Sequence, residues 1–166
     1  MASISEIKKY LVKNLTRERY AHTISLSKLA VKLAKRHGLK DISKMEVAAL
    51  LHDCQKKYES ENNHSFLAVR VARTKFKIKD KQILKAILYH TFAHRSMDDF
   101  SKIIYIADIS EPLRKFKGAG KIRRLAFKNL NDAMVLALST KIKYVIGEKK
   151  PLSLESILLY NMLVKK

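Results

Sequence analysis

The chain has 166 residues, of which 35 are basic and 15 acidic, so its formal net charge is +20. No apolar stretch reaches the roughly 20 residues that a membrane-spanning helix needs. The single cysteine, Cys54, excludes an internal disulfide and is typical of a protein from a reducing cytoplasm. With only two prolines and four glycines, we expect a cytoplasmic, mostly helical protein of one domain that does not enter the membrane.

The positive charge has two interpretations. It could attract an anionic partner, such as nucleic acid, a phosphate-rich metabolite or an anionic lipid surface. It could instead reflect a lysine-biased composition in which lysines occupy the solvated faces of helices. Lysine and arginine occur in nearly every segment without a long basic block. The sequence therefore favours the compositional interpretation, and nucleic acid is possible as a partner but not favoured.

Helix-capping patterns and apolar spacing predict successive helices over about residues 3–13, 17–37, 43–53, 62–75, 79–91, 97–110, 126–146 and 151–163. Ser-x-x-Glu capping boxes begin the first and third of these helices, at Ser3 and Ser43. The pair His37-Gly38 ends the second helix, and residues 113–120 are predicted as a loop. No convincing strand pattern and no internal repeat are present. The predicted fold is an all-α helical bundle.

Two acidic residues stand where an apolar run ends. His52-Asp53 directly follows the run 47–51, and Asp108 follows the run 103–107. A charged carboxylate at the end of a segment that is expected to be buried needs a compensating charge. The natural compensating group is a cation, so both acids are candidate metal ligands.

Histidines on or near the ends of successive predicted helices extend this pattern. A lone histidine in a helix is usually a core or surface residue, but an ordered set of histidines and acids is typical of a metal site. The candidate ligands are His22, His52, Asp53, His64, His90 and Asp108.

The order His…His-Asp…Asp, here His22, His52-Asp53 and Asp108, resembles the signature of the HD-domain metal-dependent phosphohydrolases. The finer resemblance is to the group that cleaves diadenosine tetraphosphate symmetrically (the YqeK type), and it extends from about residue 17 to 161. The stretches that carry it are Arg-Tyr-Ala-His-Thr at 19–23, Ala-Leu-Leu-His-Asp-Cys-Gln-Lys at 49–56, Ala-Ile-Leu-Tyr-His-Thr at 86–91 and Lys-Ile-Ile-Tyr-Ile-Ala-Asp-Ile-Ser-Glu-Pro-Leu-Arg at 102–114.

The chain departs from this group at three places beside the site. Ser65 follows His64 where the group has glycine, Ala93 stands near a second expected glycine, and Leu113 replaces a third. These departures bear on the fit of the substrate more than on metal binding.

The resemblance implies one HD domain over residues 1–166, with a metal-site core at about 17–115 and C-terminal helices at about 121–164. It implies a first metal held by His22, His52, Asp53 and Asp108. Asp53 would bridge to a second metal, which His64 and His90 complete. Imidazole and carboxylate ligands suit iron, manganese, zinc or cobalt, and the resemblance favours iron.

The implied reaction is the attack of a metal-held hydroxide on an inner phosphorus of diadenosine tetraphosphate, which gives two ADP. Asp53, Lys56 and Asp108 are the expected catalytic residues. Lys56, Thr91 and Arg114 are expected to bind the phosphates: Lys56 lies one helical turn after His52-Asp53, and a guanidinium matches the geometry of phosphate oxygens. A solvated Lys56 and an ordinary surface salt bridge of Arg114 remain the structural alternatives.

Other interpretations stay open. The chain could be an HD phosphohydrolase acting on another nucleotide, or a basic RNA-binding or regulatory helical domain, against which the complete ligand set argues. Glu111 could either orient a ligand or pair with Arg114. The apolar helix at 152–163 suits both core packing and a dimer contact, so a monomer and a homodimer are both compatible with the sequence.

Overall fold

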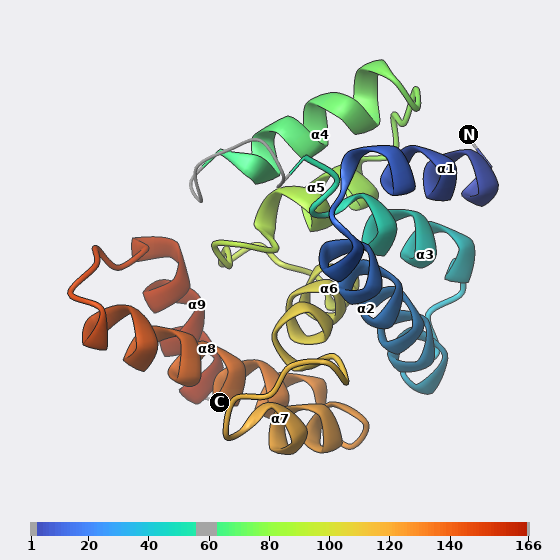
Figure 1. Ribbon diagram of the computed structural model, residues 1–166. Helices are drawn as coiled ribbons and strands as arrows, with labels where there is room; N and C mark the ends of the chain where they lie inside the picture. Colours follow the sequence, from blue (N-terminus) through green and yellow to red (C-terminus); the bar gives the residue numbers. More distant parts are fainter. Residues whose placement is uncertain (1–2, 56–62, 166) are drawn as a thin grey trace.

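The computed structural model describes residues 3–55 and 63–165, and within these residues it contains nine α-helices and no β-strand (Figure 1). The all-α prediction is therefore confirmed. The helices are α1 (Ile4–Asn14), α2 (Arg17–Arg36), α3 (Ile42–Leu51), α4 (His64–Thr74), α5 (Lys81–Tyr89), α6 (Asp99–Ser110), α7 (Ala119–Ala126), α8 (Leu130–Gly147) and α9 (Leu154–Val164).

The first two helices begin and end as their capping residues predict. Ser3 and Glu6 form the expected reciprocal capping box: the Ser3 amide donates to Glu6 Oε2 at 2.8 Å, and the Glu6 amide donates to Ser3 Oγ at 3.2 Å. Helix α2 ends at His37-Gly38, where Gly38 has a φ of +70°. Glycine is suited to this left-handed conformation because it has no Cβ to clash.

The second predicted capping box, at Ser43, is wrong. Helix α3 begins at Ile42, two residues before the start that a cap at Ser43 would give, and the residue that precedes it is Asp41. Asp41 does not cap the helix with its side chain, because its carboxylate instead pairs with Lys44 at 2.8 Å. The helix also ends at Leu51, so that His52 occupies the C-cap position and Asp53 lies in the following turn.

The predicted helix over 126–146 is in fact preceded by a separate short helix. Helix α7 ends at Ala126, and α8 begins at Leu130 after a turn. The break occurs at Asn129, whose side chain accepts a hydrogen bond from the Asp132 amide at 3.0 Å. An asparagine N-cap satisfies an amide that the helix itself leaves unpaired, which favours a new helix start. The loop expected over residues 113–120 ends at Gly118, because α7 begins at Ala119.

Helix α6 is the central element of the fold. It packs against α2, α3, α5, α7 and α8, and its run Ile103–Ala107 is buried at every position. The run Val47–Leu51 of α3 is buried as well. These are the two apolar runs that precede the acids singled out from the sequence, so burial of the runs brings His52-Asp53 and Asp108 into the same interior.

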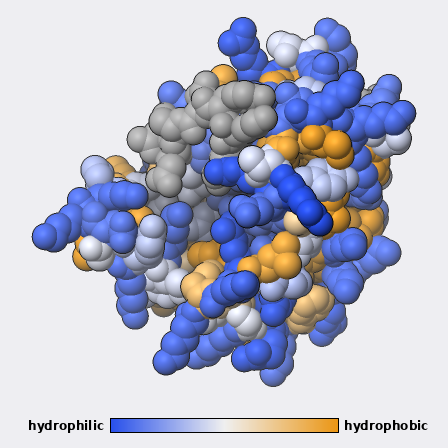
Figure 2. All heavy atoms as spheres, in the orientation of Figure 1, coloured by the Kyte–Doolittle hydropathy of each residue, from blue (hydrophilic) through white to orange (hydrophobic). Residues whose placement is uncertain are grey.

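Helices α8 and α9 form a hairpin that lies to one side of helices α1–α5 (Figure 1). The hairpin is attached to the rest of the chain through α7 and α6, on which α8 packs. Hydrophilic residues cover much of the face shown in Figure 2, with scattered apolar patches. No helix in the described part of the chain is long and apolar enough to cross a membrane.

Candidate metal centre

Two helix ends fix the orientation of two histidine rings. His52 and His90 each occupy the C-cap position, of α3 and α5 respectively. His52 Nδ1 lies 2.7 Å from the Ala49 carbonyl, and His90 Nδ1 lies 2.6 Å from the Ile87 carbonyl. Because a carbonyl can only accept, each Nδ1 carries the proton, and each Nε2 presents a lone pair to the interior. This is the tautomer that metal-binding histidines adopt.

Asp53 lies between three histidines. Its Oδ1 is 3.1 Å from His90 Nε2 and 3.3 Å from His64 Nε2, while its Oδ2 is 3.7 Å from His52 Nε2. His64 is the first residue of α4, and its Nε2 lies 3.1 Å from that of His90. The two oxygens of Asp53 thus face different histidines, as a bridging carboxylate requires.

His22 and Asp108 complete the cluster from α2 and α6. His22 Nε2 lies 3.1 Å from Asp108 Oδ1, and His22 Nδ1 lies 3.1 Å from Glu111 Oε1. Glu111 is buried, and its other oxygen accepts from the Leu113 amide at 2.7 Å. Of the two roles that the sequence left open for Glu111, the structure shows the contact with a candidate ligand. A carboxylate behind a ligating imidazole holds the ring in one orientation.

All six candidate ligands fall within three overlapping groups, each with ligand atoms no more than 4.8 Å apart. The groups are His22–His52–Asp53, His52–His90–Asp108 and Asp53–His64–His90. They come from segments as far apart as α2 and α6, so the spatial convergence that the metal-site prediction needs is present. Metal binding itself stays a prediction.

The donor set fits divalent transition metals. His52 Nε2 is buried and has no hydrogen-bond partner within the described residues. An unpaired buried nitrogen is costly unless another group, such as a cation, satisfies it. A mixture of imidazole nitrogens and carboxylate oxygens suits iron, manganese, zinc or cobalt and does not single out one of them.

The electrostatics keep His52 and Asp108 in the forms that bind metal. Burial lowers the pKa of His52 to about 4, so its imidazole is neutral. Burial alone would raise the pKa of Asp108, but the contact with His22 and the charge of Arg114 hold this pKa well below its usual range. Burial opposes charge on His22 as well, yet its contact with Asp108 raises the net pKa of the ring. The carboxylate of Asp108 is therefore ionised near neutral pH.

The cluster opens into a cavity of about 440 Å³, which His64, His90 and Asp108 line. The cavity is also lined by Thr91 and Arg114, two of the residues predicted to bind phosphates. Arg114 donates to Asp108 Oδ1 at 2.7 Å, so the salt bridge that was the structural alternative for Arg114 is present, and it lies within the same cavity.

Thr91 Oγ1 lies 2.7 Å from His64 Nε2 and 3.1 Å from His90 Nε2. Lys56, the third residue predicted to bind phosphate, lies outside the described residues. Cys54 is buried, its thiol pKa is raised to about 12 by burial, and it belongs to none of the three ligand groups.

The sequence missed the side chains that α8 adds to the cavity, Thr140, Lys141 and Tyr144. Their only signal was apolar helix periodicity, which predicts a helix but not the surface that it covers. Of the departures from the family pattern, Ser65 and Ala93 are buried, whereas Leu113 is exposed.

Comparison with known proteins agrees with this geometry. Residues 19–113 match the HD domain family. The symmetrical bis(5'-nucleosyl)-tetraphosphatase of Bacillus subtilis is 30% identical over 90% of this chain and 91% of its own length. The enzyme of the same name from Halalkalibacterium halodurans is 32% identical, with 91% of each chain covered.

A crystal structure described as a "predicted HD superfamily hydrolase involved in NAD metabolism", from Clostridium acetobutylicum, superposes with a TM-score of 0.89. It shares 32% identity and covers 99% of this chain and 98% of its own. Both the sequence and the fold are thus similar to HD hydrolases over nearly the whole length. The chain belongs to the HD-domain family, and within it to the group that includes the symmetrical bis(5'-nucleosyl)-tetraphosphatases.

Proposed function

We propose that this protein is a metal-dependent hydrolase that splits diadenosine tetraphosphate at its centre into two ADP. The observation that carries the proposal is the cluster of four histidines and two aspartates at one wall of a cavity that Arg114 also lines. The names of the relatives from Bacillus subtilis and Halalkalibacterium halodurans support the same substrate. A nucleotide substrate is also consistent with an enzyme of the cytoplasm.

The six candidate ligands would hold two divalent metal ions, of which we favour iron. His22, His52 and Asp108 would hold one ion, His64 and His90 the other, and Asp53 would contact both. When bound, such ions activate water as a nucleophile and neutralise charge on phosphate oxygens.

The protein's own side chains would position the ligands and the substrate. The carbonyls behind His52 and His90 hold both rings in the required tautomer. Arg114, whose fork already contacts Asp108, would donate its remaining N–H groups to phosphate oxygens at the cavity wall. The Thr91 hydroxyl would donate to a neighbouring phosphate oxygen.

The reaction consumes one water molecule. Its oxygen forms a bond to one inner phosphorus, and the bond from that phosphorus to the central bridging oxygen breaks. The bridging oxygen leaves with the second ADP, and one proton is released to solvent. An in-line attack at an inner phosphorus explains why both products would be ADP.

Product analysis tests the proposal directly. Metal-loaded protein incubated with diadenosine tetraphosphate should yield ADP as the sole nucleotide, and a His52→Ala variant should yield none. Equal amounts of AMP and ATP would mean asymmetric attack and would contradict the mechanism. Faster hydrolysis of another nucleotide in a parallel panel would reassign the substrate.

A further inference from the structure

A second cavity, of about 770 Å³, adjoins the one beside the metal cluster. We name the 440 Å³ cavity the proximal chamber and the 770 Å³ cavity the distal chamber. Both volumes fall in the range of roughly 300–1,000 Å³ that is usual for small-molecule sites. The residues that line both chambers are His64, Thr91, Lys141 and Tyr144.

The shared residues place the junction of the chambers at the metal cluster. His64 is a candidate ligand, and the Thr91 hydroxyl lies 2.7 Å from its Nε2. Lys141 and Tyr144 contribute to the junction from α8. A substrate cut at its centre must put its central bond at the cluster, and its two ends must then extend to either side.

Each chamber offers an aromatic ring with exposed surface. Phe116, 39% exposed, lines the proximal chamber, and Phe92, 43% exposed, lines the distal chamber. Tyr144, 56% exposed, lines both. Any nucleobase can stack on such a ring, because every base has a π-face.

The junction also carries a cation. Lys141 Nζ lies 5.9 Å from the centroid of the Tyr144 ring, and no carboxylate pairs with Lys141 in the described part of the chain. A lysine ammonium is a compact point charge that can contact the oxygens of more than one phosphate. Lys141 therefore suits the middle of a polyphosphate.

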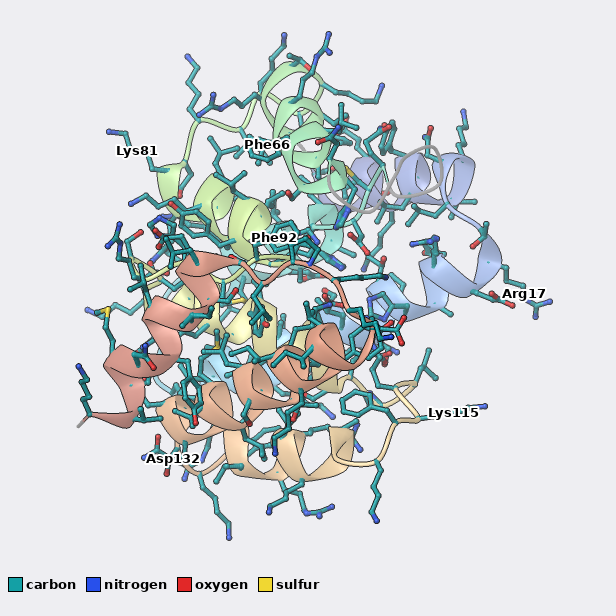
Figure 3. All side chains as sticks on the ribbon, turned by 90° about the vertical axis from the view of Figure 1, so that its left-hand side faces the viewer. Arg17, Phe66, Lys81, Phe92, Lys115 and Asp132 are labelled. Atoms are coloured by element: carbon teal, nitrogen blue, oxygen red, sulfur yellow. The ribbon has the colours of Figure 1, made fainter. Side chains whose placement is uncertain are left out.

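The loop that carries Phe92 is tied to the hairpin. His94 Nε2 lies 3.4 Å from Glu155 Oε2, and Arg95 Nη2 lies 3.2 Å from Glu155 Oε1. Glu155 stands in the first turn of α9. Figure 3 shows Phe92 on the side of the core that faces α8 and α9, whereas Phe66 lies on α4, farther from these two helices.

We propose that the proximal and distal chambers each receive one nucleoside of a dinucleoside polyphosphate, and that Lys141 binds the phosphates where the chambers meet. Phe92 is then the stacking residue for the distal nucleoside. The match to the HD domain family ends at residue 113, so α8 and α9 supply this specificity from outside the matched segment. The inference rests on the proposed function.

A comparison of two substrates isolates the distal nucleoside. A Phe92→Ala variant should raise KM for diadenosine tetraphosphate at least about fivefold through the loss of one stacking contact. Its KM for adenosine tetraphosphate, which lacks the second nucleoside, should stay unchanged. Phe92→Tyr keeps a ring and should restore the parent KM. Phe66→Ala, which removes a 64% exposed ring that lines neither chamber, is the matched control.

Lys141→Gln should raise KM for both substrates, because both place phosphates at the junction. Lys143 is on the same helix but lines neither chamber, so Lys143→Gln should leave both KM values unchanged. Calorimetric titration of the metal-loaded protein with ADP should give two sites per chain, and Phe92→Ala should weaken one of them.

The outcomes separate this inference from the proposed function. Normal hydrolysis of diadenosine tetraphosphate by Phe92→Ala, or an equal loss on both substrates, would overturn the two-chamber arrangement and leave the hydrolase intact. Binding of a single ADP by the parent protein would overturn it as well. Failure of the parent protein to hydrolyse any dinucleoside polyphosphate would instead contradict the proposed function, and the ADP titration would still test the chambers.

Discussion

The metal cluster and the α8–α9 hairpin face each other, yet they are built differently. Most of the cluster is buried, with His22 and Asp108 half-buried. Backbone carbonyls orient His52 and His90, and the Glu111 carboxylate orients His22. The hairpin side is exposed and presents a lysine and aromatic rings. A buried polar group must have its partners in place, whereas an exposed side chain is ordered when a ligand arrives. We therefore expect the cluster to perform the chemistry and the hairpin to select the substrate.

The largest expected effect comes from the centre of the cluster. Asp53→Asn removes the charge that faces three histidines and should lower activity more than about 100-fold. Loss of a residue that only supports a metal ligand already lowers metal affinity or activity about 10- to 100-fold. Metal analysis of the purified variant should show fewer bound ions than the parent protein. Full metal content with full activity would contradict the role of Asp53 as a ligand.

Loss of the carboxylate behind His22 should have the next largest effect. Glu111→Gln should weaken metal affinity about 10- to 100-fold, because a neutral amide holds the imidazole less firmly. Competition with a chelator measures this affinity, and a thermal melt of the variant separates it from misfolding. Glu148→Gln, on an exposed residue after α8, is the control. An unchanged affinity would limit Glu111 to a structural role.

Arg114 distinguishes substrate binding from support of the cluster. Arg114→Ala should raise KM about tenfold, or about 1.4 kcal/mol, while metal content stays intact. Arg124→Ala, on an exposed residue of α7, should change neither quantity. Loss of metal from Arg114→Ala would show that its ion pair with Asp108 supports the ligand instead of the phosphate.

The smallest expected effect lies away from the cluster, at the start of α5. Asp80 accepts from the Gln82 and Ile83 amides at 2.9 and 3.2 Å and pairs with Lys44 at 3.1 Å. Burial opposes the charge, but these partners lower the pKa of Asp80 below its ordinary value. Because the pKa is lowered in the fold, the ionised carboxylate stabilises the fold at pH values above about 3.9, the pKa of an aspartate in the unfolded chain. This stabilisation is lost as the pH falls through the pKa of the folded protein.

Asp80→Ala should therefore lower the free energy of unfolding by about 1 kcal/mol near neutral pH, as expected for a lost N-cap. The difference from the parent protein should shrink as the pH falls below about 4. Urea denaturation at a series of pH values measures it, and hydrolase activity should be unaffected at neutral pH. A difference that does not depend on pH would mean that the Asp80 charge contributes nothing.

The same contrast explains how much the sequence could predict. His52-Asp53 and Asp108 are identifiable because each follows an apolar run, where a buried carboxylate needs a compensating charge; the other histidines follow from their order along the chain and from the family resemblance. Ser43 shows the limit of local patterns: its capping box is complete in sequence, yet the helix begins beside Asp41. Likewise, the sequence analysis begins a helix at about residue 126 and does not identify the Asn129 cap that divides α7 from α8.

The contact of Glu111 with His22 and the place of the α8 side chains lay beyond sequence reasoning. Glu111 is three residues from Asp108 and also three from Arg114, so both partners looked equally available, and only the fold brings His22 to it from α2. Lys141 and Tyr144 had no motif at all. Their place at the junction of the chambers depends on how α8 packs on α6 and α7.

We expect side chains from the segments α2 to α6 to hold two neighbouring metal ions. The most direct measurement is an anomalous-scattering map from crystals of the metal-loaded protein. The account predicts two peaks roughly 3.5–4 Å apart, with Asp53 between them, His52 beside one and His90 beside the other. A map with no peak among these residues, or with metal bound only elsewhere, would contradict it.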